Sequence, residues 1–268
     1  MIRVAINGYG RIGRIAHRVI IQKHSQEIDV VAINAGSSTD IKGWMYLLKY
    51  DSIYGLLPSE ISFKSNTDIN KPDLIGYLII SGKEIPVYSQ KDSTKLPWKD
   101  YDVDVVIEST GKYTKLEKLQ AHTNAGAKSV VLSSPAKGGN VPTYVISVND
   151  EKYSGENILN NASCTTNCIA PVAKVIEESF GIEKAMMTTV HGFTSDQKLL
   201  DGGHKDYRRA RAASVNIIPT STGATLAAGE ALPALSGIFA GMAIRVPVPV
   251  GSLADFTFLL KKILPKKK

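Results

Sequence analysis

Apolar and polar positions in the first half of the chain follow two different periods. Short apolar runs predict strands over residues 2–6, 29–34, 103–107, 129–132 and 144–148. Helical spacing predicts helices over 11–23 and 115–125, and two apolar runs at 74–81 and 84–88 predict a hairpin. Strands that alternate with helices are typical of an α/β fold with a parallel sheet, and we expect this fold class.

The pattern changes near residue 162. A polar stretch around Cys164 leads into an apolar run with helical spacing at 169–176, which predicts a helix that begins at the cysteine. Further on, residues 186–191, 242–246 and 254–260 predict longer strands with polar ends. We therefore expect two domains, an α/β domain over 1–162 and an α+β domain over 163–268.

A G-x-G-x-x-G motif lies between the first predicted strand and the first predicted helix. Gly8 permits a tight turn, Gly10 lets a pyrophosphate approach the backbone, and Gly13 lets the helix pack closely on the strand. The helix would begin at Arg11 and Ile12 and present its free amides to the phosphates. The motif in this context predicts a dinucleotide-binding domain.

Other cofactor contacts are expected where the predicted strands end. An acidic residue usually follows the second strand and binds the ribose hydroxyls, but Asn34 and Ala35 stand here, and Asp40 comes late. Ligands of open α/β sheets bind at the C-terminal ends of strands. Three further residues at such ends are therefore candidate contacts, namely Thr110, Gly111 and Ser133.

Cys164 is the candidate nucleophile. Ser163 before it is a natural N-cap, so the cysteine would lie at the positive end of the helix dipole, which favours the thiolate. The alternative is a buried cysteine that acts as a small apolar residue. His191 ends a predicted strand and is the best candidate base; the alternative is a histidine held by hydrogen bonds in the core.

Residues 201–211 are polar and rich in glycine and arginine, which predicts a long loop. Its three arginines support phosphate recognition and a solvated basic loop about equally. Residues 219–223 predict a hydroxyl-rich turn before another helix, where backbone amides could bind an anion.

Composition narrows the class of protein. The chain has 268 residues, of which 43% are hydrophobic and 21% charged, as expected for a soluble globular protein. Its two cysteines indicate neither a disulfide framework nor a metal site, and we expect a cytoplasmic protein with no membrane segment. The net charge of +7 suits an anionic substrate; the lysine-rich stretch at 261–268 is more typical of a solvated end than of a nucleic-acid site.

Seven stretches resemble the phosphorylating glyceraldehyde-3-phosphate dehydrogenase family, and they span nearly the whole chain. They are INGYGRIGR at 6–14, ESTG at 108–111, ASCTTNC at 162–168, TTVH at 188–191, RRAR at 208–211, PTSTGA at 219–224 and GMAIRVP at 241–247. The resemblance implies a Rossmann-type dinucleotide-binding domain followed by a catalytic domain, and an oxidoreductase of glycolysis and gluconeogenesis.

The resemblance also implies a mechanism. Cys164 would attack the aldehyde of a sugar phosphate, and His191 would take the hydroxyl proton as hydride passes to NAD or NADP. Inorganic phosphate would then release an acyl phosphate from the thioester. The family's positions around the substrate phosphate correspond to Thr194, Asp196 and Arg245. Those around the attacking phosphate correspond to Ser163, Thr165, Arg209, Thr222 and Gly223.

The sequence departs from the family pattern at its C-terminal end. Family members continue beyond the strand expected at 254–260, so the chain resembles a C-terminally truncated member with an incomplete catalytic domain. Two alternatives stay open. Erythrose-4-phosphate dehydrogenase uses the same cysteine and histidine, and a non-catalytic remnant with a basic tail could bind anionic partners.

The resemblance bears on cofactor and assembly as well. NAD-specific members carry Asp where this chain has Ala35, and commonly Leu-Pro where it has Gly202-Gly203. Loss of the carboxylate removes both a repulsion of the 2′-phosphate of NADP and a contact to NAD, which favours dual use with a preference for NADP. Family members are homotetramers in which the loop at 201–213 packs near a neighbouring subunit's cofactor, so we expect a homotetramer.

Overall fold

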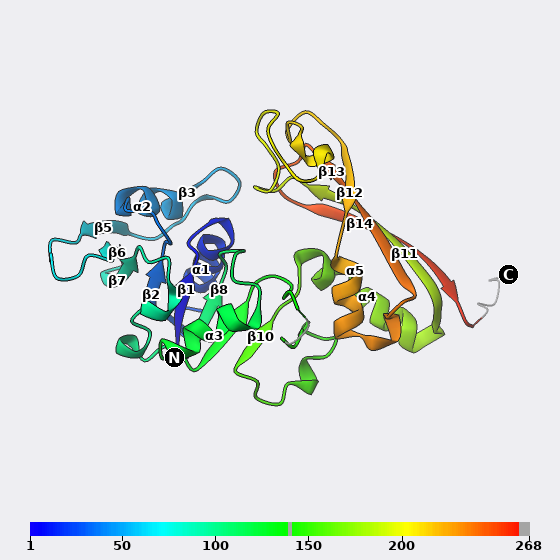
Figure 1. Cartoon of the computed structure of the whole chain (residues 1–268), viewed down its shortest axis with the longest axis horizontal. Helices are drawn as coiled ribbons and strands as arrows, with labels where there is room; N and C mark the ends of the chain where they lie inside the picture. Colours follow the sequence, from blue (N-terminus) through cyan, green and yellow to red (C-terminus); the bar gives the residue numbers. More distant parts are fainter. Residues whose placement is uncertain (139–140, 263–268) are drawn as a thin grey trace. The chain divides into compact units, whose positions relative to one another are not determined.

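The computed structural model describes residues 1–138 and 141–262 and divides into two compact units (Figure 1). The first unit contains Met1–Pro142 and Ser154–Asn161, and the second contains Thr143–Tyr153 and Ala162–Lys268. The main division falls one residue before the boundary expected after residue 162. The segment Thr143–Tyr153 precedes this boundary in the sequence but belongs to the second unit, because Val145 and Val148 pack into the core of that unit. The lysine-rich stretch expected at 261–268 lies mostly outside the described residues.

The first unit is built on an eight-stranded sheet in the order β10-β9-β8-β1-β2-β7-β6-β5. The strands are β1 (Ile2–Asn7), β2 (Ile28–Asn34), β5 (Ile61–Ser65), β6 (Leu74–Ile80), β7 (Lys83–Tyr88), β8 (Val105–Glu108), β9 (Ser129–Leu132) and β10 (Ile158–Asn160). All neighbours from β10 to β7 are parallel, whereas β5, β6 and β7 pair antiparallel. The predicted parallel sheet and the predicted hairpin are both confirmed.

Helices cover both faces of this sheet. They are α1 (Arg11–Lys23), α2 (Ile41–Lys49) and α3 (Leu116–Asn124); a two-stranded ribbon of β3 (Tyr50–Asp51) and β4 (Gly55–Leu56) follows α2. Ile6 packs with Ile20 of α1 on one face, while its neighbour Ala5 packs with Leu119 of α3 on the other. Successive residues of β1 point into two different apolar cores, so both faces of the strand are buried and its sequence is a continuous apolar run. Three short 3₁₀ turns complete this description: η1 (Ser93–Lys95), η2 (Lys99–Tyr101) and, in the second unit, η3 (Asp150–Lys152).

The strand predicted at 144–148 is wrong. Val145 and Ser147 donate their amides to the side chains of Asn149 and Asp150, at 2.9 and 2.7 Å. Side chains that bind nearby amides compete with a strand ladder, and Ser147 adopts a positive φ of 65°. The segment is therefore a compact turn that contributes Val145 to the second core.

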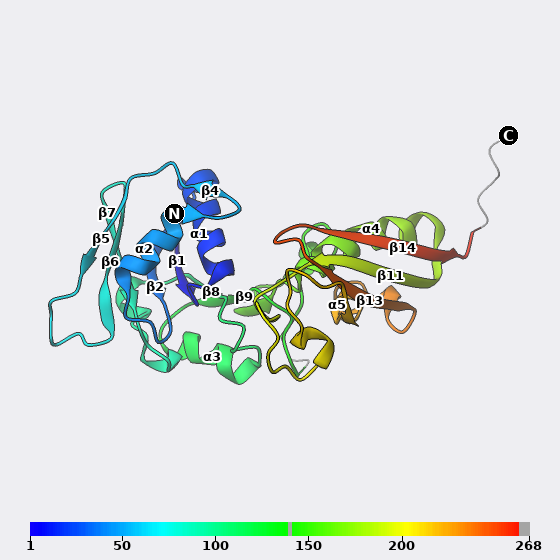
Figure 2. The same ribbon diagram turned by 90° about the horizontal axis from the view of Figure 1, so that it is seen from above.

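The second unit has a four-stranded sheet in the order β12-β13-β11-β14. Strands β11, β13 and β14 are labelled in Figure 2. The strands are β11 (Ile182–Gly192), β12 (Ile218–Ser221), β13 (Phe239–Val246) and β14 (Ser252–Leu260); the helices are α4 (Cys164–Phe180) and α5 (Ala224–Ala231), with 3₁₀ turns η4 (Tyr207–Ala210) and η5 (Pro233–Leu235). Both helices share one apolar core with β11 and β13. The turn predicted at 219–223 is only partly correct, since residues 219–221 pair with β13.

Candidate active site

Cys164 begins α4 as the sequence predicted. Ser163 is the N-cap, and its Oγ accepts a hydrogen bond from the amide of Thr166 at 3.0 Å. The hydroxyl of Thr166 in turn donates to the carbonyl of Ala224 at 3.1 Å, which ties the start of α4 to the start of α5. The cap holds Cys164 in the first turn, where the helix dipole favours an anion.

The structure brings Cys164 and His191 together. The distance from Sγ to Nε2 is 3.6 Å, within the range of a hydrogen bond that involves sulfur. This hydrogen bond lowers the pKa of the Cys164 thiol below its usual range, although partial burial acts in the opposite direction. A cysteine with a lowered pKa next to a histidine is the arrangement found in cysteine nucleophiles.

Arg245 completes the cluster around His191. The two residues are register partners on the neighbouring parallel strands β11 and β13. Nη1 of Arg245 lies 2.9 Å from Nδ1 of His191 and donates to the carbonyl of Gly192 at 3.0 Å. Cys164, His191 and Arg245 therefore form one contiguous group at the ends of α4, β11 and β13.

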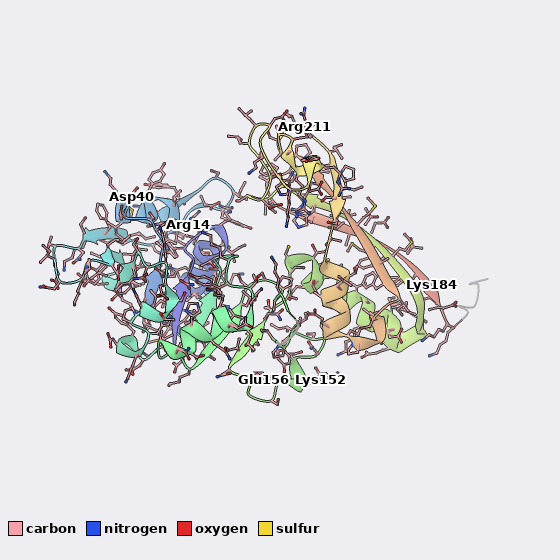
Figure 3. All side chains as sticks on the ribbon, in the orientation of Figure 1. Arg14, Asp40, Lys152, Glu156, Lys184 and Arg211 are labelled. Atoms are coloured by element: carbon pink, nitrogen blue, oxygen red, sulfur yellow. The ribbon has the colours of Figure 1, made fainter. Side chains whose placement is uncertain are left out.

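Arg209 is held in a second polar cluster. Its guanidinium donates to Asp196 at 2.8 Å, to the hydroxyl of Thr220 at 2.8 Å and to the carbonyl of Ser221 at 3.0 Å. The other two arginines of the loop form exposed ion pairs, Arg208 with Asp206 and Arg211 with Asp201. Arg211 is labelled in Figure 3. The loop at 201–211 thus contains one half-buried, oriented arginine and two solvated ones.

His204 is a member of this cluster that sequence reasoning missed. Its Nε2 lies 3.3 Å from the Asp196 carboxylate, and its Nδ1 accepts from the amide of Asp206 at 2.9 Å. Partial burial raises the pKa of Asp196, but hydrogen bonds from Arg209 and His204 outweigh it and lower the pKa. Asp196 therefore orients Arg209, and His204 in turn holds Asp196.

The remaining expected anion contacts lie on exposed or half-buried backbone. Gly223 is the N-cap of α5 and has open space around its α-carbon, while the Thr222 hydroxyl accepts from the Ala224 amide at 3.1 Å. Thr194 is exposed and its amide approaches Gln197 at 3.4 Å; Thr165 lies beside Cys164 in the first turn of α4. Within the described residues, the structure does not bring Thr194 into hydrogen-bond contact with Arg245, nor Thr165 with Arg209.

Cys168 lies one helical turn beyond Cys164, and from the sequence alone we expect its side chain to pack inward; the structure shows that this expectation is wrong. Both cysteines are exposed, because residues four apart lie on the same face of a helix. The core below α4 is filled by Ile169, Ala170 and Ala173 instead. The two thiols therefore differ in their hydrogen-bond partners rather than in their access to solvent.

We expect iodoacetamide to label Cys164 faster than Cys168 at neutral pH. The thiolate is the reactive form, and only Cys164 combines the first turn of α4 with a contact to His191. Mass spectrometry of proteolytic peptides after short labelling times measures both rates in one sample. Equal rates in the folded protein, with both faster in urea, would contradict a special reactivity of Cys164.

The glycine motif of the first unit has the shape that a pyrophosphate needs. Gly8 has a φ of 94°, and a Cβ on it would lie 2.5 Å from the Thr110 amide nitrogen; a Cβ on Gly13 would lie 2.3 Å from the Gly8 carbonyl. Gly10, the N-cap of α1, has open space around it and offers no side-chain cap. The amides of Arg11 and Ile12 are thus left to a ligand, and the cradle fits a dinucleotide.

The end of β2 has Asn34 and Ala35 where an acidic residue usually follows the second strand. Asp40 accepts from the amide of Gly43 at 2.7 Å and is the N-cap of α2, so its carboxylate is already engaged (Figure 3). Ala35 donates its amide to the carbonyl of Tyr88 at 2.8 Å. Asn34 is buried, and its side chain donates to Asn7 at 2.7 Å and to the carbonyl of Gln90 at 2.8 Å. Asn34 therefore links the residue before the glycine motif, Asn7, to Gln90, which follows β7.

A buried network under the same edge escaped sequence reasoning. The carboxylate of Glu108 accepts hydrogen bonds from Asn7, from the Nε2 of His122 at 3.1 Å and from the amide and hydroxyl of Thr110. The indole of Trp98 donates to the other nitrogen of His122 at 3.0 Å. Four hydrogen-bond donors thus satisfy the fully buried carboxylate of Glu108. These bonds fix the loop that contains Thr110 and Gly111. Ser133 lies nearby, with its amide on the Glu108 carbonyl at 3.0 Å.

The described residues, 1–138 and 141–262, contain no cluster of three His, Cys, Asp or Glu side chains suited to a metal ion. Within the same ranges, none of the helices has both the length and the apolar character needed to span a bilayer.

Comparison with known proteins matches both units. Residues 2–116 match the NAD binding domain of glyceraldehyde 3-phosphate dehydrogenase, and residues 163–267 match the C-terminal domain of the same enzyme. Glyceraldehyde-3-phosphate dehydrogenases of Clostridium acetobutylicum, Mycobacterium avium and Kluyveromyces lactis are 49%, 48% and 47% identical over 97–98% of this chain and 75% of their own length. The chain belongs to the glyceraldehyde 3-phosphate dehydrogenase family.

Proposed function

We propose that this protein oxidises glyceraldehyde 3-phosphate and joins the product to inorganic phosphate, the reaction of glycolysis that its family carries out. The observation that carries the proposal is the 3.6 Å contact between Cys164 and His191 at a capped helix start. A thiolate there can form a covalent adduct with an aldehyde, and the neighbouring imidazole can exchange its proton. The compartment we propose is the reducing cytoplasm, where such a thiolate persists.

Each chemical step has a residue to support it. The thiol of Cys164 passes its proton to His191 and adds to the aldehyde carbon, and the new oxyanion takes that proton back from His191 to give a hemithioacetal. His191 then removes that hydroxyl proton as the adduct is oxidised to a thioester. NAD, when bound at the glycine cradle, supplies the hydride acceptor for this oxidation. Inorganic phosphate attacks the thioester carbon, the C–S bond breaks, and the Cys164 thiolate is released with the acyl phosphate.

Two anion sites would hold the phosphate groups. Arg245, with Thr194 and Asp196, is proposed to bind the phosphate of the substrate. Arg209 is proposed to bind the attacking phosphate, together with the residues at the starts of α4 and α5, namely Ser163, Thr165, Thr222 and Gly223. Oriented guanidinium groups, hydroxyls and free amides are the donors that phosphate requires.

The purified chain tests the proposal directly. With glyceraldehyde 3-phosphate, NAD and inorganic phosphate, we expect continuous formation of NADH. When phosphate is left out, we expect a burst that stops near one NADH per active site, because the thioester cannot be released efficiently. A parallel assay with erythrose 4-phosphate ranks the two aldehydes. Steady formation of NADH at the same rate with and without phosphate would contradict the two-step scheme.

We propose that the protein accepts both NAD and NADP and prefers NADP. Ala35 places a methyl group where an acidic residue would follow β2, Asp40 caps α2 through its bond to the Gly43 amide, and Gly36 has open space around it. Ala35 itself neither repels a 2′-phosphate nor accepts hydrogen bonds from the ribose hydroxyls of NAD.

Ala35→Asp is expected to shift the ratio of kcat/KM toward NAD by about tenfold or more, because the new carboxylate can accept from the ribose hydroxyls of NAD and also repels the 2′-phosphate of NADP. The measurement is kcat/KM with each cofactor in parent and variant, and Ser38→Asp serves as a matched control further into the exposed loop. A parent that strongly prefers NAD, or a variant with an unchanged ratio, would refute the role of this position.

We propose a homotetramer as the functional assembly. Several large apolar side chains of the second unit are exposed, among them Leu199, Leu200, Val215 and Ile217, and each is at least 70% exposed. Large apolar side chains exposed within one stretch of the chain favour a surface that another subunit covers. Light scattering coupled to gel filtration should report about four times the mass of one chain. A monomer at working concentrations would count against the proposal for the 268-residue chain.

A further inference from the structure

The strand order of the eight-stranded sheet reverses between β1 and β8. From β1 the chain passes to β2 on one side, and it later returns to β8 on the other. A dinucleotide lies across such a switch point, outside the carboxyl ends of the strands. Asn7 and Glu108 are register partners at these two ends, and both are fully buried. Contacts between them therefore bear on the shape of the cofactor cradle.

One series of hydrogen bonds reaches Glu108 from the side of β2. The backbone of Gln90 orients the side chain of Asn34, because its amide donates to the Asn34 oxygen at 3.0 Å and its carbonyl accepts from the Asn34 nitrogen at 2.8 Å. The same nitrogen of Asn34 donates to the side-chain oxygen of Asn7 at 2.7 Å. The nitrogen of Asn7 is thereby turned toward Glu108, and it donates to Oε2 of the carboxylate.

A second series reaches the same oxygen from the side of α3. The indole of Trp98 can only donate, and it donates to Nδ1 of His122 at 3.0 Å. The ring proton of the neutral imidazole is therefore on Nε2, which donates to Oε2 of Glu108 at 3.1 Å. Nε2 of His122 lies 3.3 Å from the side-chain nitrogen of Asn7, a separation that fits two donors sharing one carboxylate oxygen.

The other oxygen of Glu108 holds the loop that follows β8. Oε1 accepts from the amide of Thr110 at 2.8 Å and from its hydroxyl, whose oxygen in turn accepts from the amide of Lys112 at 3.1 Å. The glycine motif packs directly on this loop: a Cβ on Gly8 would lie 2.5 Å from the Thr110 amide nitrogen, and the hydroxyl of Ser109 donates to the Gly8 carbonyl at 2.7 Å. A shift of Thr110 would therefore displace the first glycine of the motif.

Packing alone does not account for the carboxylate of Glu108. Among residues 1–138 and 141–262, no lysine or arginine forms an ion pair with it, and its one listed charge partner, His122, is held neutral by Trp98. A fully buried carboxylate without a cation costs free energy, and an apolar side chain would fill the same volume at lower cost. The four donors that converge on Glu108 instead require an acceptor at the switch point.

We propose that Glu108 is a positioning residue for the dinucleotide: its carboxylate ties the ends of β1 and β8 together and so sets Gly8 and Thr110 in place before the cofactor binds. This inference rests on the proposed function in one respect, that NAD or NADP is the ligand of the first unit. Glu108 acts through the two loops and does not itself contact the cofactor.

Glu108→Gln in the full chain tests the proposal, because the side chain keeps its size. The oxygen of the new amide can still accept from Thr110, but its nitrogen faces two other donors, on Asn7 and His122. We expect the Kd for NAD, measured by isothermal titration calorimetry, to rise by about tenfold or more. The KM for NAD should rise in parallel, whereas kcat at saturating NAD should stay within about threefold, since the proposed nucleophile and base belong to the other unit.

The double variant Asn7→Asp/Glu108→Gln is the matched control, since it moves the carboxylate from β8 to β1. The carboxylate at position 7 can accept from Asn34, from the new amide at position 108, and from Nε2 of His122, which already lies 3.3 Å from this side chain. Each donor of the network again meets an acceptor, and we expect the Kd for NAD to return to within about threefold of the parent. A Kd that stays as high as in Glu108→Gln would overturn the proposal.

Hydrogen exchange in the free parent tests the same claim without a variant. Because Glu108 holds the Thr110 amide before the cofactor arrives, this amide should exchange at least about 10²-fold more slowly than in an unstructured peptide, with little further slowing when NAD is added. Mass spectrometry with fragmentation measures the rate at this residue. An unprotected amide that only NAD protects, or a Glu108→Gln variant that binds NAD as tightly as the parent, would overturn the role of Glu108 alone. A parent that binds neither NAD nor NADP would overturn the proposed cofactor as well.

Discussion

Cys164→Ser is expected to lower kcat/KM by at least about 10³-fold, because the serine hydroxyl is a far weaker nucleophile than a thiolate at neutral pH. The substitution removes one sulfur atom from the first turn of α4 and leaves the Ser163 cap and the helix core unchanged. Stability should therefore change little, and the loss should appear in kcat. Steady-state kinetics with saturating NAD and phosphate measure it.

Cys168→Ser is the matched control for this variant. The residue lies one helical turn further along the same exposed face of α4, and it has no contact with His191 among the described residues. Its kinetics should stay within about twofold of the parent. If both serine variants lost activity equally, or if Cys164→Ser kept a substantial fraction of the parent rate, a nucleophilic Cys164 would be excluded.

His191→Asn is expected to lower kcat by about 10²- to 10⁴-fold, the usual contribution of a positioned general base. It also removes the hydrogen bond that lowers the pKa of Cys164. In the parent, the thiolate forms above this lowered pKa, so alkylation persists at a pH where an ordinary thiol is unreactive and declines only as the pH falls through the lowered value. In the variant, the midpoint should move upward toward the ordinary range.

Rates of iodoacetamide labelling of Cys164 between about pH 5 and 10 give that midpoint. Asparagine can place its amide near the Nδ1 side of the former ring, which keeps the end of β11 polar, and labelling of Cys168 in the same samples corrects for reagent reactivity. An unchanged midpoint for Cys164 would mean that the helix start alone lowers its pKa. An unchanged kcat would remove His191 from the proton transfer.

Local sequence signals predicted the parts of the fold that local interactions determine. The run from β1 through the glycine motif into α1 combines an apolar strand, a tight turn and an amphipathic helix, and each is visible in neighbouring residues. The Ser163 cap and the start of α4 at Cys164 are equally local. The candidate nucleophile and its helix could therefore be predicted without a structure.

Predictions failed where side chains change the local preference. The apolar run at 144–148 predicts a strand, but Asn149 and Asp150 bind its amides and turn it into a compact loop. Pro219 suggested a turn, yet it lies in an edge strand of the second sheet, where proline needs no ladder partner. The exposure of Cys168 could not be predicted either, because it depends on which face of α4 packs against α5.

Long-range partners in the site gave no signal in the sequence. His122 and Glu108 are 14 residues apart on different elements, and Asn7 is 101 residues from Glu108. His204 meets Asp196 only through the course of a loop. Motifs mark residues that face a ligand, whereas the residues that orient them are set by packing. The contact between Arg245 and His191 became visible only through the pairing of β11 with β13.

The central claim, a thioester on Cys164, can be observed directly. The protein is mixed with glyceraldehyde 3-phosphate and NAD in phosphate-free buffer, quenched in acid, and its peptides are analysed by mass spectrometry. We predict one phosphoglyceroyl group on the peptide that contains Cys164, located on that residue by fragmentation and discharged when inorganic phosphate is added before the quench. Formation of NADH with no such adduct, or an adduct on Cys168 instead, would contradict the account.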